Sequence, residues 1–151
     1  MSQPPRTNLA QFNWATLRYD VDDPRVAEFV DNVARMNLIA ERMPGFVWRH
    51  HYDSKALSRL KRPLPFERTD RFTTTLSVWR DARALADFAF RTIHNRFYEK
   101  RALWFEPHKG PYMVMWYVAE GHRPDIDEAV DRAEEPKQAS NFRENSIALN
   151  I

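Results

Sequence analysis

Residues 90–105 combine the residue types that small-molecule chemistry uses most often. The stretch holds His94 among basic and large aromatic side chains. An imidazole can accept or donate a proton near neutral pH, and apolar walls with a few polar groups are typical of ligand pockets. At about 100° per residue, His94 falls at the margin of the apolar stripe of a predicted helix. A histidine in that position is more often structural than catalytic, but its aromatic and cationic neighbours favour a site.

Four further side chains complete the predicted pocket, which we place between the sheet and the long helix. We expect Asn13 to line this pocket, and we expect Trp48, Arg101 and Trp104 to bind a substrate there. Apolar walls next to a cation suit a planar aromatic or polyene-type molecule that carries a phenolate or a carboxylate. The alternative for the tryptophans is a place in the core or in a dimer interface, where aromatic residues are common.

Composition limits the classes of protein to consider. The chain has 151 residues, of which 43% are hydrophobic, which is enough for one core and too few for two comfortable domains. The formal net charge is only +2 and no basic helix face is present, so we expect no nucleic-acid partner. Cysteine is absent and no apolar run approaches the roughly 20 residues of a membrane span. These features predict a cytoplasmic protein with no membrane partner and no metal site.

Hydrophobic periodicity predicts four strands, at residues 8–18, 46–52, 71–79 and 112–119. A helix is expected between Asp22-Asp23-Pro24 and Met43-Pro44-Gly45, a second one runs from Asp81 to just before Pro107, and a short acidic one covers 125–135. Residues 53–69 form a long basic connection that we expect to be a loop over the pocket mouth. The end of the chain predicts either an edge strand or disorder.

The order strand, helix, strand, strand, helix, strand is typical of a ferredoxin-like α+β fold with helices on one face of the sheet. We expect a disordered segment at 1–7, one domain at 8–135 and a tail at 136–151. Two helices cover one sheet face, and the other face has aromatic side chains that need a second layer. Pairing of two copies through that face would bury it, so we expect a homodimer with a pocket in each subunit.

Several motifs together resemble one known family. They are Phe12-Asn13-Trp14-Ala15, Asn37 to Arg49, Ser77-Val78-Trp79, His94 to Phe105, Val114 to Val118 and Gly121-His122-Arg123-Pro124. The sequence is similar over residues 9–134 to an uncharacterised bacterial domain family of the dimeric α+β barrel superfamily, close to the antibiotic-biosynthesis monooxygenases. The resemblance implies a dimeric α+β barrel fold, whereas the superfamily hosts several unrelated activities.

Two functions follow from the resemblance, and a third remains open beside them. The first is monooxygenase-like chemistry without a cofactor on an apolar aromatic or polyene-type substrate, in which Asn13 orients the substrate and His94 moves a proton. The second is haem binding with His94 as axial ligand, because the motif from His94 to Trp104-Phe105 is similar to one in the spheroidene monooxygenase group. The third is binding of a small molecule without catalysis. No cofactor is the expectation, and haem is the alternative.

Overall fold

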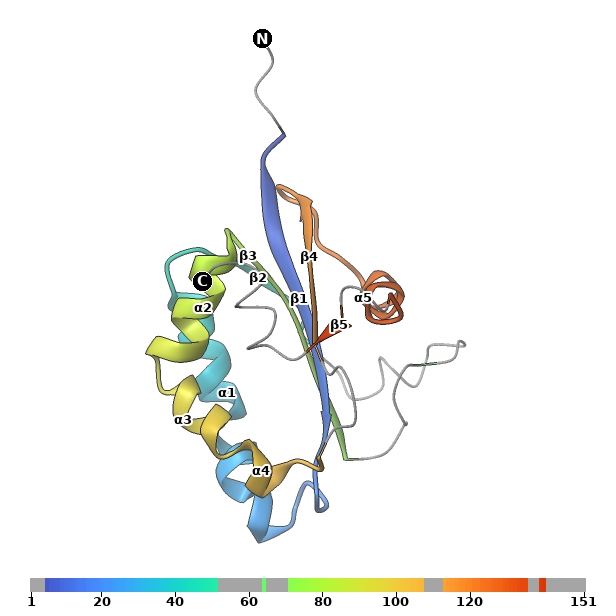
Figure 1. The fold of residues 1–151 in the computed structure, drawn as a ribbon. Coiled ribbons are helices and arrows are strands. Elements are labelled where there is room, and N and C mark those ends of the chain that lie inside the picture. Colours follow the sequence, from blue (N-terminus) through green and yellow to red (C-terminus); the bar gives the residue numbers. More distant parts are fainter. Residues whose placement is uncertain (1–4, 52–63, 65–70, 108–112, 136–138, 141–151) are drawn as a thin grey trace.

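Five strands form one antiparallel sheet in the order β2-β3-β1-β4-β5, and helices pack on both of its faces (Figure 1). The computed structural model describes residues 5–51, 64, 71–107, 113–135 and 139–140. The strands are β1 (Thr7–Thr16), β2 (Phe46–Arg49), β3 (Phe72–Trp79), β4 (Met113–Ala119) and β5 (Ala139–Ser140). The helices are the 3₁₀ turn η1 (Pro24–Val26), α1 (Ala27–Arg42), α2 (Ala82–Arg91), α3 (His94–Glu99), α4 (Arg101–Trp104) and α5 (Ile126–Ala133).

The first four strands confirm the predicted ferredoxin-like α+β fold. β1 is the central strand and pairs with both β3 and β4, while β2 pairs with the far edge of β3. Each helical connection therefore crosses over one strand, which is the split βαβ arrangement. β5 adds two residues at the β4 edge.

Helices α1 to α4 lie on one side of the sheet and α5 lies on the other (Figure 1). The prediction of helices on one face only was therefore wrong. The apolar edge of α5 contains Ile126, Ala129, Val130 and Ala133, all of them buried. These residues pack in one cluster with the β1, β3 and β4 side chains of that face, namely Ala10, Phe12, Trp14, Leu76, Val78, Val114, Trp116 and Val118. The chain itself thus buries the aromatic face that we expected a second copy to cover, and the homodimer stays a prediction.

Strand β2 contains a β-bulge that reverses one expected side-chain direction. Phe46 pairs with Trp79, and Trp48 pairs with the next residue of β3, Val78, so that Val47 is an extra residue. Phe46 accordingly packs in the cluster under the helices, whereas Trp48 packs in the cluster under α5. In a strand without a bulge, alternation would place Phe46 and Trp48 on the same face.

The long helix predicted between Asp81 and Pro107 is broken into α2, α3 and α4. Asp81 caps α2 as expected, by accepting a hydrogen bond from the backbone N–H of Ala84 at 2.8 Å. The break follows at Thr92, which has an extended backbone and whose hydroxyl donates to the Phe88 carbonyl oxygen at 2.6 Å. A threonine hydroxyl that bonds to the previous turn competes with the helical pattern. The break makes His94 the first residue of a new helix.

The ends of α1 agree with the sequence prediction. Asp23 caps the turn that leads into it, with Pro24 following, and the helix ends at Arg42, just before Met43-Pro44-Gly45. An ion pair of 2.6 Å between Arg49 Nε and Glu41 Oε1 ties α1 to β2. Ala40 is the one fully buried residue of this helix, while Phe29 and Val30 are partly buried against the cluster around Trp104.

The start of the chain is more ordered than predicted. The Arg6 carbonyl oxygen accepts a hydrogen bond from the Glu120 N–H at 3.0 Å, and β1 begins at Thr7. The expectation of disorder at 1–7 is therefore wrong for these two residues. Most of the predicted loop at 53–69 and most of the tail at 136–151 lie outside the described residues. None of the described helices has the length and apolar character required to span a membrane.

Candidate functional site

A ladder of hydrogen-bonded polar side chains crosses the helix-facing side of the sheet. Gln11 Nε2 in β1 donates to Thr75 Oγ1 at 3.0 Å and to Ser77 Oγ at 2.8 Å, both in β3. Thr75 Oγ1 donates in turn to Asn13 Oδ1 at 2.7 Å. At the other end, the indole N–H of Trp79 donates to Ser77 Oγ at 2.9 Å. Five side chains on two central strands are thus connected on one face.

Part of the hydrogen-bonding capacity of this ladder is unused within the described part of the chain. Gln11 is 5% exposed and its Oε1 atom accepts no hydrogen bond there, although both protons of its amide are engaged. The Ser77 hydroxyl, 8% exposed, accepts two hydrogen bonds and donates none in the same region. Buried polar groups are nearly always paired with protein, water or ligand. The ladder can therefore bind a molecule that has both a donor and an acceptor.

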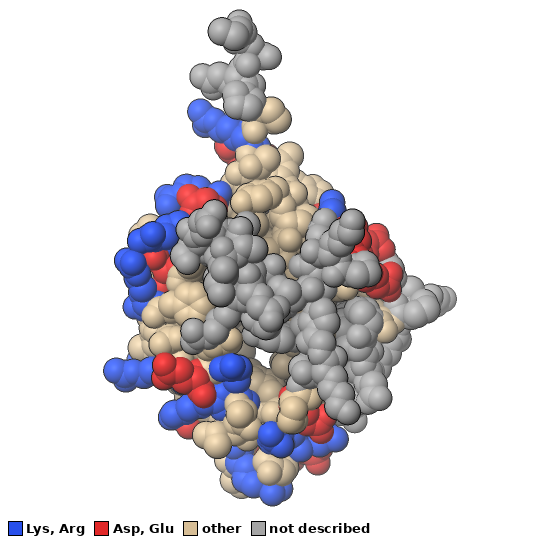
Figure 2. Space-filling model, in the orientation of Figure 1, with Lys and Arg blue, Asp and Glu red and all other residues tan. Residues whose placement is uncertain are grey.

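The helix layer leaves space above the Asn13 end of the ladder. Thr75 is exposed even though β3 has a neighbouring strand on each side. Val33, an apolar residue of α1, is 39% exposed. Figure 2 shows an opening between the helix layer and the sheet. The ladder thus runs from a buried end at Trp79 to an accessible end at Asn13.

His94, at the start of α3, has a defined tautomer. Its Nδ1 lies 3.1 Å from the Ala89 carbonyl oxygen. Because a carbonyl oxygen can only accept, Nδ1 must carry the proton, and in a neutral ring Nε2 then holds the lone pair. Within the described residues Nε2 has no hydrogen-bond partner. His94 therefore presents a basic nitrogen.

Burial lowers the pKa of His94 below its usual range, and the hydrogen bond to Ala89 opposes this shift in part. Removal from water disfavours the charged imidazolium. The ring is consequently neutral at pH 7, which is the state in which Nε2 can accept a proton.

A stack of rings connects His94 to the polar ladder. The ring centroids of His94 and Phe88 are 4.8 Å apart, and Phe88 stacks on Trp79 at 5.3 Å with an interplanar angle of 21°. The Trp79 indole is also the donor at the buried end of the ladder. His94 and Asn13, the two predicted catalytic residues, thus belong to one connected system on the helix-facing side of the sheet.

The three predicted substrate-binding residues lie elsewhere. Trp48 packs on the opposite sheet face because of the bulge in β2. Trp104 is 2% exposed in a separate cluster with Leu17 and Val26. Arg101 is exposed on α4, where its guanidinium lies 4.1 Å from the centroid of the Tyr98 ring. The structure therefore does not assemble the five residues into one pocket.

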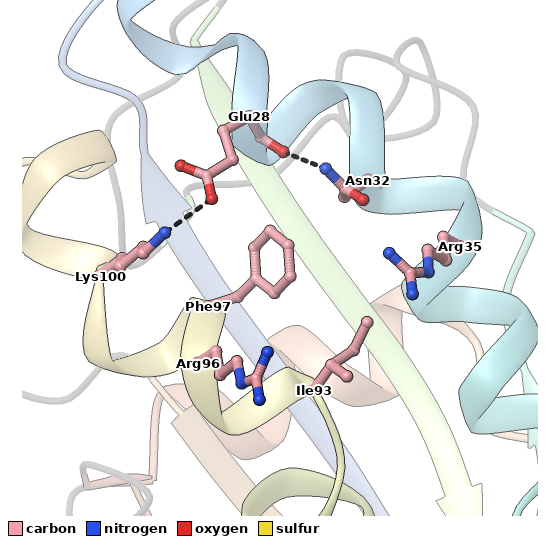
Figure 3. A pocket seen from close by; sticks show the side chains of 7 residues that line it. All are labelled: Glu28, Asn32, Arg35, Ile93, Arg96, Phe97 and Lys100. Carbon is pink, nitrogen blue, oxygen red and sulfur yellow. Dashed lines mark hydrogen bonds and ion pairs between the residues drawn. The ribbon is translucent and has the colours of Figure 1, made fainter.

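The described residues form a cleft between α1 and α3 (Figure 3). Its volume is about 290 Å³. The lining residues are Glu28, Asn32 and Arg35 from α1, and Ile93, Arg96, Phe97 and Lys100 from α3 and its two flanking positions. An ion pair of 2.7 Å between Lys100 Nζ and Glu28 Oε1 connects the two walls.

Sequence reasoning missed the ladder and the cleft, although each has a signal in the sequence. Gln11 interrupts the apolar positions of a strand that is buried on both faces. Glu28, Asn32 and Arg35 follow the i, i+4, i+7 spacing of one helix face. Neither signal specifies a partner element, so contacts between elements could not be predicted from it.

The described residues do not form a pocket suited to haem. The tautomer of His94 is the one that an axial ligand needs. The cleft, however, is lined by Ile93 and Phe97 rather than by His94, and its volume is small for a tetrapyrrole. In the same part of the chain, no three His, Cys, Asp or Glu side chains are grouped as metal ligands. Among the described residues, haem therefore has no site that fits it.

Fold and site together define an α+β protein with a ferredoxin-like sheet and a polar ladder beneath its main helix layer. The family described as Domain of unknown function (DUF3291) matches residues 8–141. That match covers most of the chain, and the protein belongs to this family. Among curated proteins, none matches the sequence.

Solved structures give three distant likenesses. SnoaB, a cofactor-independent oxygenase from Streptomyces nogalater, is 18% identical with a TM-score of 0.46, over 79% of this chain and 96% of that chain. NE2512, a protein of unknown function from Nitrosomonas europaea, is 13% identical with a TM-score of 0.47, over 81% and 97%. PA3566 from Pseudomonas aeruginosa is 15% identical with a TM-score of 0.45, over 78% and 98%. Nothing about activity follows from likenesses at this level.

Proposed function

We propose that the protein is a small-molecule enzyme of the monooxygenase type that oxidises a polycyclic phenol without a cofactor. The observation that carries the proposal is the state of His94, a neutral imidazole with its Nδ1 proton bound to Ala89 and its Nε2 free to accept a proton within the described structure. The reaction type comes from the sequence resemblance described above. The polar ladder supplies groups that can orient a hydroxyl or carbonyl of the substrate.

The reaction needs one base and dioxygen. His94 Nε2 takes the phenolic proton, and the resulting phenolate is electron-rich enough to add dioxygen at its para carbon. The peroxide anion recovers the proton from the imidazolium, and the hydroperoxide loses water to leave a quinone. For phenol itself the balance is C₆H₆O + O₂ → C₆H₄O₂ + H₂O. The substrate provides both electrons that reduce the second oxygen atom, so no external reductant is required.

Asn13 and Gln11 have distinct roles in this proposal. Asn13 lies at the accessible end of the ladder and retains its amide N–H groups as donors in the described region, so it can hold the phenolate oxygen. Gln11 offers a buried acceptor through Oε1. Donors fixed before the reaction stabilise a developing negative charge at little reorganisation cost.

Replacement of His94 by glutamine tests the proposal. We expect oxygen uptake with a panel of naphthols and hydroxyanthracenes to fall about 100-fold or more in His94→Gln, since general-base catalysis contributes about 10²–10⁴-fold. Binding, measured as a ligand-induced rise in Tm, should largely persist. The product from ¹⁸O₂ should contain one labelled oxygen atom.

The matched control is His122→Gln. His122 is an exposed histidine whose ring bonds to Glu128 of α5, on the other side of the sheet, and its replacement should leave oxygen uptake unchanged. Compounds that bind the wild-type protein without any oxygen uptake would favour a non-catalytic binder and contradict the proposal. So would a His94→Gln variant that oxidises them at the wild-type rate.

A further inference from the structure

We infer that the cleft between α1 and α3 binds a small aromatic carboxylate, with Arg35 and Arg96 holding the carboxylate and Phe97 and Ile93 contacting the ring. The inference concerns binding and is independent of the reaction proposed above. It rests on the geometry of the two walls, on their charges and on the size of the cavity.

Each wall of the cleft is one face of a helical segment. Glu28, Asn32 and Arg35 are spaced i, i+4, i+7 on α1. Ile93, Arg96, Phe97 and Lys100 are spaced i, i+3, i+4, i+7 across α3. Residues at these spacings share a side of a helix. In Figure 3 the two sets face one another, with the strands of the sheet behind them.

The charges of the cleft favour an anion. Three cations and one carboxylate line it, and Lys100 is already paired with Glu28. The guanidinium groups of Arg35 and Arg96 have no hydrogen-bond or ion-pair partner in the described structure. Figure 3 shows both directed toward the space between the helices, one from each wall. A guanidinium offers a planar pair of donors that matches a carboxylate, so two of them from opposite sides can hold one between them.

The apolar residues that line the cleft favour an anion that carries an aromatic ring. Phe97 and Ile93 lie next to the arginines and provide apolar contact. The volume of about 290 Å³ is at the small end of ligand pockets, which corresponds to one or two fused rings. An inorganic anion would make no contact with the apolar part of the lining that the cleft exposes.

Calorimetric titration with 1-naphthoate tests the inference, with the neutral analogue 1-naphthylmethanol and inorganic phosphate as comparison ligands. We expect 1-naphthoate to bind the wild-type protein about tenfold or more tightly than the alcohol or phosphate. Only 1-naphthoate has both a carboxylate for the two arginines and a ring for the apolar residues of the cleft. Arg35→Gln and Arg96→Gln should each weaken 1-naphthoate binding by about tenfold, which is the size of one charge-assisted hydrogen bond. Binding should also weaken as salt is added, since the arginines are accessible to ions.

The matched control is Arg42→Gln, which removes an exposed arginine of the same helix that does not line the cleft. It should bind 1-naphthoate as the wild type does. The inference is overturned if 1-naphthoate does not bind at millimolar concentration, if phosphate binds equally well, or if the Arg35→Gln/Arg96→Gln double variant keeps the wild-type affinity. Because these are binding measurements, they remain decisive even if no oxygen uptake is ever observed.

Discussion

Replacement of Trp104 by alanine is expected to destabilise the protein by about 3–5 kcal/mol, the range measured for large aromatic residues in cores. Trp104 is 2% exposed, and its ring lies 5.7 Å from that of Phe29 and 5.6 Å from that of Phe97. Its carbonyl oxygen also accepts a hydrogen bond of 2.7 Å from the Arg18 N–H. The side chain thus joins α4 to α1 and to α3, whereas the backbone hydrogen bond to Arg18, which the substitution keeps, holds α4 next to the residues that follow β1. Urea unfolding followed by circular dichroism measures the loss.

Leu103→Ala is the control for this prediction. Leu103 precedes Trp104 in the same helix and is 62% exposed, so its truncation should change stability by no more than about 0.5 kcal/mol. A Trp104→Ala protein as stable as this control, but impaired in ligand binding, would show that Trp104 is a substrate-binding residue after all. That outcome would restore the role that the sequence suggested.

Gly45→Ala is expected to cost about 2–4 kcal/mol, which combines a backbone term with a steric one. Gly45 has φ +86°, in the left-handed region that favours glycine. An added Cβ would also lie 2.5 Å from the Ala84 Cβ, where the turn before β2 meets helix α2. Thermal or urea unfolding of the variant gives the free energy.

Gly121→Ala separates the two contributions. Gly121 has φ +88°, but nothing lies within 4 Å of the position its Cβ would take. Its replacement should therefore lose only the backbone term, about 1 kcal/mol. Adding Ala84→Gly to Gly45→Ala should recover part of the larger loss, which a double-mutant cycle can measure. Equal losses at the two glycines would disprove the close contact with α2.

Periodicity and end signals were sufficient to predict the elements of this fold. The alternation in residues 71–79 assigned the two faces of β3 correctly, with Leu76 and Val78 opposite Ser77 and Trp79. Asp81 was recognised as a helix cap because its carboxylate can accept from a backbone N–H three residues later. Both signals depend on residues that are close together in the sequence, so the sequence alone is enough to recognise them.

The errors arose at places where an interaction that hydrophobic periodicity does not describe determines the structure. The Thr92 hydroxyl breaks a stretch that is otherwise helical by periodicity. The bulge in β2 cannot be recognised in Phe46-Val47-Trp48, because three large apolar residues in a row fit either register. The location of α5 on the second face depends on the packing of the whole sheet, which periodicity does not describe.

The residue types of the candidate site could be predicted from the sequence, but the contacts between these residues could not. His94 and Asn13 were selected by residue type, and both lie on the helix-facing side of the sheet. Gln11 and Ser77 were overlooked because alternation assigns a polar strand residue to the solvent-facing side. In the structure both side chains are buried, and a hydrogen bond connects them. Trp104 was assigned to the pocket for its size, which serves a core equally well.

The most direct test of the account is a pH titration of the imidazole nitrogens by long-range ¹H–¹⁵N NMR, with His94→Gln used to assign the signals. Between about pH 5 and about pH 8, this measurement reports both the tautomer and the pKa of each histidine. The pKa of His94 is lower in the folded protein than in the unfolded chain. In the pH interval just below the ordinary histidine pKa, the unfolded chain therefore binds a proton at this residue that the folded protein does not bind. Stability should therefore decrease as the pH falls through that interval, and His94→Gln should remove this part of the decrease.

We predict that folded His94 has a pKa below the ordinary value and is neutral at pH 7, with the proton on Nδ1 and the lone pair on Nε2. Addition of a phenol that binds should then shift the Nε2 resonance. A His94 that titrates at or above the ordinary value, or that carries its proton on Nε2, would contradict the central claim that this residue is the base of the site.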